Sequence, residues 1–151
     1  MSRKWIGILL VPSLVVVVGI GNQLSLADDH ETPLGKIMEQ VQKHNITITK
    51  GTRNATTYKK SQKDVAKAAK ELVKLSKEAK PFTDYLKNAK DAENPQQKWD
   101  EIMDAFTKYS EELAEKAADE TATQKDVKDV FQNVKKTCSD CHTVFRVEDD
   151  F

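Results

Sequence analysis

A periodic stripe near the end of the chain restricts the fold more than any other sequence feature. Between residues 127 and 145, apolar side chains, two cysteines and a histidine recur at intervals of three and four, the spacing of one helical face. The members of this stripe are Val127, Val130, Phe131, Val134, Cys138, Cys141, His142 and Phe145. The pattern predicts one amphipathic helix that buries both cysteines and the histidine. Thr121 followed by Gln124 predicts a capping box at its start.

Two segments in the middle of the chain have the same periodicity. Asn94 and Pro95 predict the start of a helix over residues 96–118, with asparagine as the cap and proline in the first turn. A second helix is predicted over residues 61–80, with Ser61 as its cap. We therefore expect two long amphipathic helices here.

The first helix is predicted to begin at Thr32 and Pro33, again a cap followed by proline. Its apolar pattern fades after His44. Residues 45–49 are rich in β-branched side chains, which leaves an irregular helical continuation and a short extended piece both open. Residues 50–60 are polar and are expected to form a loop or a weak helical extension.

Residues that form turns are scarce, with 5 glycines and 4 prolines. This scarcity argues against a sandwich or barrel of many strands. Residues 81–95 join two predicted helices, with a short turn expected around Tyr85. Four amphipathic helices joined by short connections predict an all-α fold, an antiparallel four-helix bundle with up-down-up-down topology.

The first 27 residues have the pattern of an export signal. Arg3 and Lys4 precede an apolar run over residues 5–20, and small residues at Ser25 and Ala27 suit cleavage after Ala27. Residues 1–27 are predicted to be a signal peptide and residues 28–151 the mature domain, exported to the periplasm. An uncleaved membrane anchor is the alternative. The 24 basic and 24 acidic residues balance, which argues against a nucleic-acid-binding protein.

The residues Cys138-Ser139-Asp140-Cys141-His142 form a C-x-x-C-H motif. This motif is the attachment signature of c-type haem, because two thiols on one helical face reach two vinyl groups and the histidine can bind the iron. A redox C-x-x-C would need a strand before its helix. Half of a zinc site or a short disulfide would also use two close cysteines, and helix geometry disfavours the disulfide.

The export signal, the helical pattern and the late Cys-x-x-Cys-His-x-x-Phe-Arg run from Cys138 to Arg146 resemble the class II c-type cytochromes. This family includes cytochrome c′ and its low-spin relatives. The resemblance implies one covalently attached haem c on the last helix, with Arg146 close to its proximal side. Phe145 is a candidate to wall the porphyrin. A homodimer is a common assembly of such proteins.

In the low-spin branch, a methionine on the first helix is the sixth ligand, and the resemblance assigns that role to Met38. Filling the core is the alternative role for Met38, and His44 is the alternative ligand. Met103 is expected to be core. With Met38 bound, the protein would carry single electrons between redox partner proteins. With five-coordinate iron, it would bind nitric oxide or carbon monoxide. The sequence contains no acid–base pair of the kind that enzymes use, so we do not expect the protein to be an enzyme.

Overall fold

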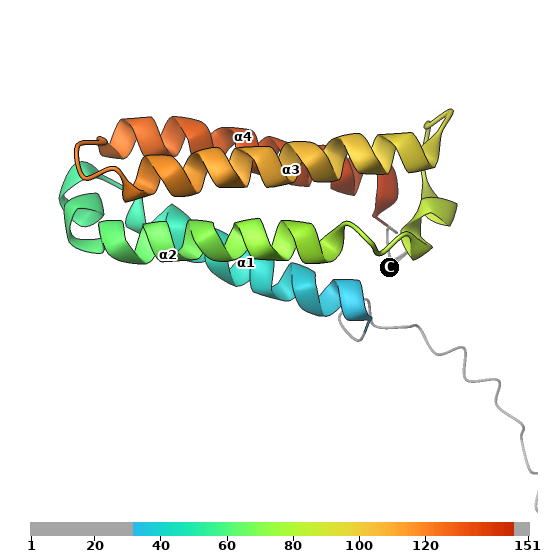
Figure 1. Ribbon diagram of the computed structural model, residues 1–151, viewed down its shortest axis with the longest axis horizontal. Helices are drawn as coiled ribbons and strands as arrows, with labels where there is room; N and C mark the ends of the chain where they lie inside the picture. Colours follow the sequence, from blue (N-terminus) through green and yellow to red (C-terminus); the bar gives the residue numbers. More distant parts are fainter. Residues whose placement is uncertain (1–31, 147–151) are drawn as a thin grey trace, which may run out of the picture.

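The computed structural model describes residues 32–146, which form four α-helices and one short 3-10 helix and contain no strand (Figure 1). The elements are α1 (Pro33–Gly51), α2 (Ala55–Ala79), η2 (Asp84–Asn88), α3 (Pro95–Ala118) and α4 (Gln124–Phe145). This arrangement confirms the predicted all-α four-helix bundle. The predicted signal peptide and its cleavage point lie outside the described residues.

Two helix starts follow the predicted caps. Thr32 Oγ1 accepts a hydrogen bond of 2.9 Å from the Gly35 amide, and Pro33 stands in the first turn of α1. Asn94 Oδ1 accepts one of 3.1 Å from the Gln97 amide at the start of α3. These caps satisfy amide donors that lack a partner within the helix.

The predicted start of the second helix at Ser61 is wrong, whereas the helical continuation of the first helix, one of the alternatives left open, is confirmed. Helix α1 continues to Gly51 because Ile48, in the β-branched stretch, is fully buried. A Cβ on Gly51 would lie 2.4 Å from a methyl carbon of Val65, so the glycine lets α1 approach α2 closely. The cap of α2 is Asn54, and Ser61 lies inside the helix, where its hydroxyl donates to the Thr57 carbonyl. Helix α2 is therefore longer than expected.

The predicted capping box of the last helix is also wrong by two residues. Thr123 caps α4, and the Asp126 carboxylate accepts a hydrogen bond of 2.9 Å from the Thr123 amide. Thr121 instead donates from its amide and its hydroxyl to Asp119. Gln124 reaches away from the cap, and its Nε2 donates to the Thr52 carbonyl at 2.6 Å.

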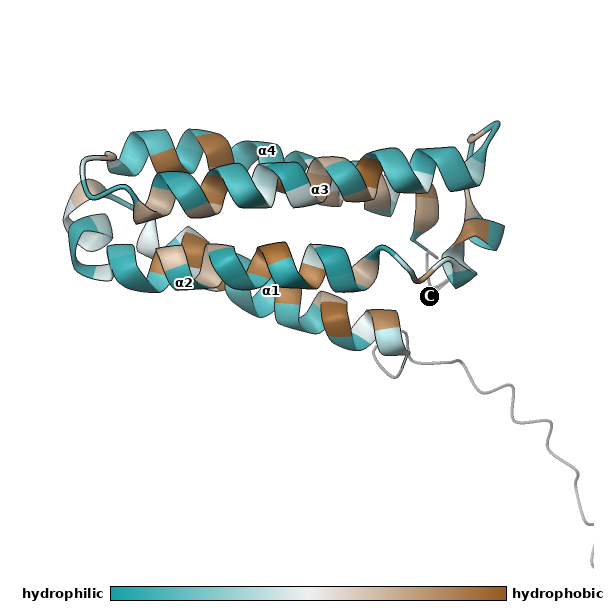
Figure 2. Cartoon of the chain, viewed as in Figure 1, coloured by the Kyte–Doolittle hydropathy of each residue, from teal (hydrophilic) through white to brown (hydrophobic). Residues whose placement is uncertain are grey.

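The helices pack in chain order, α1 on α2, α2 on α3 and α3 on α4. The start of α1, η2 and the end of α4 lie at one end of the bundle (Figure 1). Apolar and polar segments alternate along each helix (Figure 2), and the apolar ones form a single core. Of the helices described, none has the length and apolarity needed to cross a membrane.

The packing is not uniform around the bundle. The Cα atoms of α1 and α4 nowhere come within 8 Å of each other along the two helices. We call this boundary the α1/α4 seam, and the well-packed boundary on the other side the α2/α3 seam. The backbones of α1 and α4 therefore stay farther apart than those of the other neighbouring helices.

Candidate functional site

The C-x-x-C-H motif occupies the last turns of α4. Cys138 and Cys141 are half-buried, and His142 is exposed. The expectation that all three are buried is therefore wrong for His142. The core-facing line of α4 passes through Val134 and Phe145, and the histidine lies beside that line rather than on it.

Both cysteines are free thiols in the structure. Burial raises the pKa of the Cys138 thiol, and the Asn45 amide, which approaches from α1, lowers that pKa in part. Burial, with a smaller contribution from Cys138, raises the pKa of Cys141 to about 12. Within residues 32–146, no group of three or more His, Cys, Asp or Glu side chains is arranged to hold a metal ion.

Asn45 marks the place where α1 faces the motif. Its Oδ1 is buried and, within the described part of the chain, has no hydrogen-bond partner, although the Asn45 side chain lies close enough to Cys138 to lower the pKa of that thiol. Buried polar atoms are normally paired, and an unpaired one marks a position where a partner is missing. Nothing in the sequence signals this residue, because its approach to Cys138 depends on the packing of two distant helices.

Met38 lies on the same face of α1 as Asn45, because seven residues make almost two full turns. Helices α1 and α4 are antiparallel (Figure 1). The residues of α1 that precede Asn45 therefore lie on the side of the residues of α4 that follow Cys138, and His142 is one of these. Met38 is half-buried and packs against the edge of the core.

The other residues that the sequence analysis singled out lie in different surroundings. His44 faces α2, where burial lowers its pKa and Glu71 opposes that effect, so it does not join the motif. Met103 is buried in α3, as predicted for a core residue. Phe145 is buried and meets Trp99 edge-to-face with ring centroids 5.3 Å apart. Arg146 is exposed and follows α4 directly.

A hollow opens in the α1/α4 seam beside Asn45. It has a volume of about 300 Å³ and is lined by Gln42, Asn45, Ile46, Thr49, Lys50 and Lys135. We call it the α1/α4 groove. Five of its six residues come from α1, and Lys135 lies one turn before Cys138 on α4.

The segment around η2 ties together the two helices that flank the motif. The hydroxyl groups of Tyr85 and Thr32 are 2.8 Å apart, which links η2 to the cap of α1. The Lys90 amide donates a hydrogen bond of 2.8 Å to the Val144 carbonyl in the last turn of α4. The sequence indicates a turn near Tyr85, but a backbone bond such as that from Lys90 leaves no pattern in the sequence.

These features define a four-helix bundle whose last helix presents two thiols and a histidine toward the α1/α4 seam. The chain matches the family model described as Cytochrome C′ over residues 34–146, from the first turn of α1 to the residue after α4. It therefore belongs to the cytochrome c′ family. Searches of curated proteins and of solved structures returned no match.

Members of this family carry a covalently attached haem c and are typically periplasmic. The residues of this chain fit that group. The two thiols, three residues apart on one helix, would form thioether bonds with the vinyl groups, and His142 would bind the iron. Beside these residues, the Cα atoms of α1 and α4 do not come within 8 Å of each other. The buried Asn45 Oδ1 at this seam has no hydrogen-bond partner among residues 32–146.

Proposed function

We propose that the protein is an exported, periplasmic c-type cytochrome that carries single electrons between redox proteins and is not itself an enzyme. In this proposal, His142 and Met38 would hold the haem iron. The haem would supply one-electron chemistry, and a thioether ligand would raise its reduction potential.

The shared face of Met38 and Asn45 carries this proposal. Asn45 lies beside Cys138, so the face of α1 that holds Met38 looks across the seam toward α4. A methionine has three rotatable side-chain bonds, so a half-buried thioether at a seam can reach across it.

The surrounding residues would keep this arrangement rigid. Tyr85 holds the Thr32 cap, which fixes the first turn of α1 just before Met38. Phe145, packed on Trp99, fixes the last turn of α4 just after His142. A ligand pair held at both ends by packed elements changes little in geometry when an electron is gained or lost, which suits electron transfer.

Optical spectra of the haem-loaded protein test the proposal. We expect a low-spin spectrum with a sulfur-to-iron band and no response of the reduced protein to carbon monoxide. Met38→Leu should turn the iron high-spin, lower the reduction potential and allow carbon monoxide to bind. Met103→Leu is the matched control, because it makes the same change in the core of α3 and should leave the spectrum unaltered.

A gas-binding protein with five-coordinate iron is the second candidate. It is favoured by the exposure of His142 and by the separation of α1 from α4, whose Cα atoms do not come within 8 Å of each other. In that case the wild-type protein would be high-spin and would respond to carbon monoxide, and Met38→Leu would leave the spectrum nearly unchanged. That result would overturn the electron-carrier proposal.

A further inference from the structure

The charges of α4 are divided between two sides of the helix. Lys135 lines the α1/α4 groove, and Lys128 and His142 lie seven residues before and after it, on the same side. Arg146 follows one turn after His142. The charged residues on the side of α4 that faces α1 are therefore all basic.

The acidic residues of α4 are engaged elsewhere. Asp129 pairs with Lys125, and Asp140 pairs with Lys136 at 2.7 Å. Asp126 is held in the capping box. Both ion pairs run along the outer face of the helix, and none of these carboxylates balances the basic side.

On the α1 side, Lys50 is the one charged residue of the groove lining. Glu39, the single acidic residue of α1, lies one turn before Gln42, outside that lining. Within residues 32–146, neither Lys50, Lys128 nor Lys135 forms an ion pair with a carboxylate. Lys135 lies over the Phe131 ring, 5.4 Å from its centroid.

Ile46 gives the groove an apolar element. This residue is 42% exposed, and no other large hydrophobic residue in the described part of the chain is as exposed. The uncharged polar side chains of Gln42 and Thr49 lie beside it in the lining. An apolar centre with a charged, hydrated rim is the anatomy of a protein-binding surface.

We propose that the α1/α4 groove and its basic rim of Lys50, Lys128 and Lys135 form the docking surface for an acidic redox protein. This inference rests on the proposed electron-carrier function and names its partner's chemistry. Carboxylates of the partner would pair with the rim lysines, and an apolar side chain would cover Ile46. The groove includes Asn45, which adjoins Cys138, so a partner docked there lies next to the thiol that would anchor the haem.

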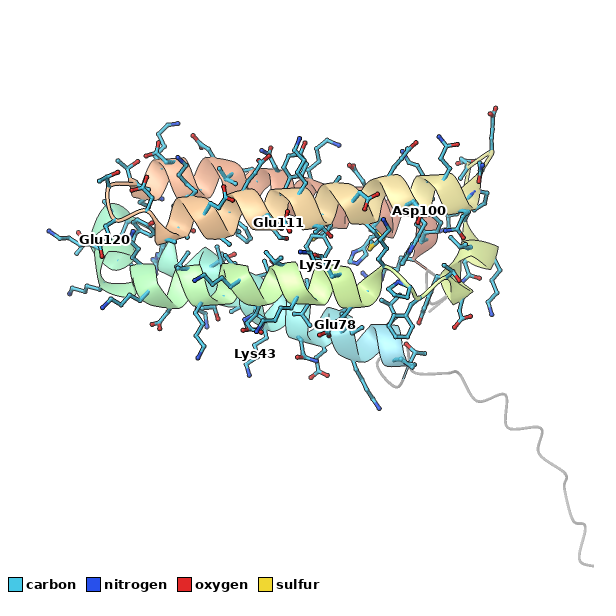
Figure 3. All side chains as sticks on the ribbon, viewed as in Figure 1. Lys43, Lys77, Glu78, Asp100, Glu111 and Glu120 are labelled. Atoms are coloured by element: carbon cyan, nitrogen blue, oxygen red, sulfur yellow. The ribbon has the colours of Figure 1, made fainter. Side chains whose placement is uncertain are left out.

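Charge complementarity argues for this occupant. The rim lysines stand on both sides of the groove and raise the rate at which an acidic surface finds it, because opposite charges steer the encounter. Two lysines near the α2/α3 seam differ, because each pairs with a carboxylate. Lys77 and Glu111 face each other across α2 and α3 at 2.7 Å (Figure 3), as do Lys80 and Asp104 at 2.5 Å.

The test compares two double charge reversals in the haem-loaded protein. Lys50→Glu with Lys135→Glu changes the groove. Lys63→Glu with Lys70→Glu makes the same change in net charge on exposed lysines of α2. Binding of poly-L-glutamate, as a probe of carboxylate-rich surfaces, is measured by calorimetry. Oxidation of the reduced protein is followed with anionic ferricyanide, which takes up one electron to become ferrocyanide, and with a cationic cobalt(III) complex.

We expect the groove variant to bind poly-L-glutamate more weakly and to be oxidised by ferricyanide about tenfold more slowly at low salt. The α2 control should change each of these two quantities by less than about twofold. The cationic oxidant should react faster with the groove variant. Equal effects in both variants would overturn the proposal, because net charge alone would then explain them. Loss of haem or an altered resting spectrum in the groove variant alone would also overturn it, because the lysines would then serve the haem propionates.

The two proposals can fail separately. A carbon monoxide response of the wild-type protein contradicts the electron-carrier function and does not alter poly-L-glutamate binding. Unchanged poly-L-glutamate binding in the groove variant contradicts the docking surface and leaves the ligand spectrum as it was.

Discussion

The two seams of the bundle are built in opposite ways. At the α2/α3 seam, Thr107 Oγ1 lies 3.0 Å from Ser76 Oγ, and Lys77 pairs with Glu111 across the surface. Along the α1/α4 seam the helices stay apart, and a hydrogen bond from Gln124 to the Thr52 carbonyl links the two chain segments at the end far from the motif. The α2/α3 seam is closed by the side chains of its own helices, whereas those of α1 and α4 leave their seam open.

This difference separates stability from function in the molecule. A closed seam with matched hydrogen bonds and apolar contacts supplies folding free energy. The α1/α4 seam, with half-buried thiols and an unpaired Asn45 oxygen, supplies less. Changes at the α2/α3 seam should therefore act on unfolding, and changes at the α1/α4 seam on the cofactor and its chemistry.

The largest expected effect is at the α1/α4 seam. Cys138→Ser with Cys141→Ser should abolish covalent haem attachment, because both thioether bonds are lost. Denaturing gels stained for haem measure this directly. Ser139→Ala, an exposed change between the two cysteines, is the control and should keep the haem. A double variant that still held haem covalently would contradict the assignment of the motif.

The next effect concerns the α2/α3 seam. Leu72 is fully buried and lies one turn before Ser76. Leu72→Ala should lower the free energy of unfolding by about 2–5 kcal/mol, because it leaves a cavity, with the haem spectrum unchanged. Urea unfolding followed by circular dichroism is the measurement. Ile46→Ala, at the open groove, should change the same quantity by less than about 0.5 kcal/mol. Similar losses in both variants would remove the distinction between the seams.

Much of the fold could be predicted from the sequence because helical periodicity is a local property. The cap at Asn94 is local in the same way, and so is the haem motif from Cys138 to His142. The boundaries at Ser61 and Thr121 were not predictable from local patterns, since several residues there are able to cap a helix. The close approach of Gly51 to Val65 extends α1, and Asp119 engages Thr121.

The site shows the same division. Its linear part, the C-x-x-C-H motif, can be read from five adjacent residues. Its tertiary part cannot, because the approach of Asn45 to Cys138 and the bond from Lys90 to Val144 join segments far apart in the chain. The exposure of His142 also depends on where the core line of α4 runs. The assignment of Met38 as a ligand stays a prediction.

The smallest expected effect tests whether the α1/α4 seam is under-packed in the absence of haem. In the haem-free protein, Asn45→Leu removes a buried acceptor that has no hydrogen-bond partner among the described residues. It should raise the free energy of unfolding by about 1 kcal/mol more than Asn133→Leu, the same change at an exposed position of α4. The control cancels the better helix propensity of leucine, so the difference isolates the buried amide. If Asn45→Leu were the less stable variant, the amide would already be satisfied, and the α1/α4 seam would be closed without haem.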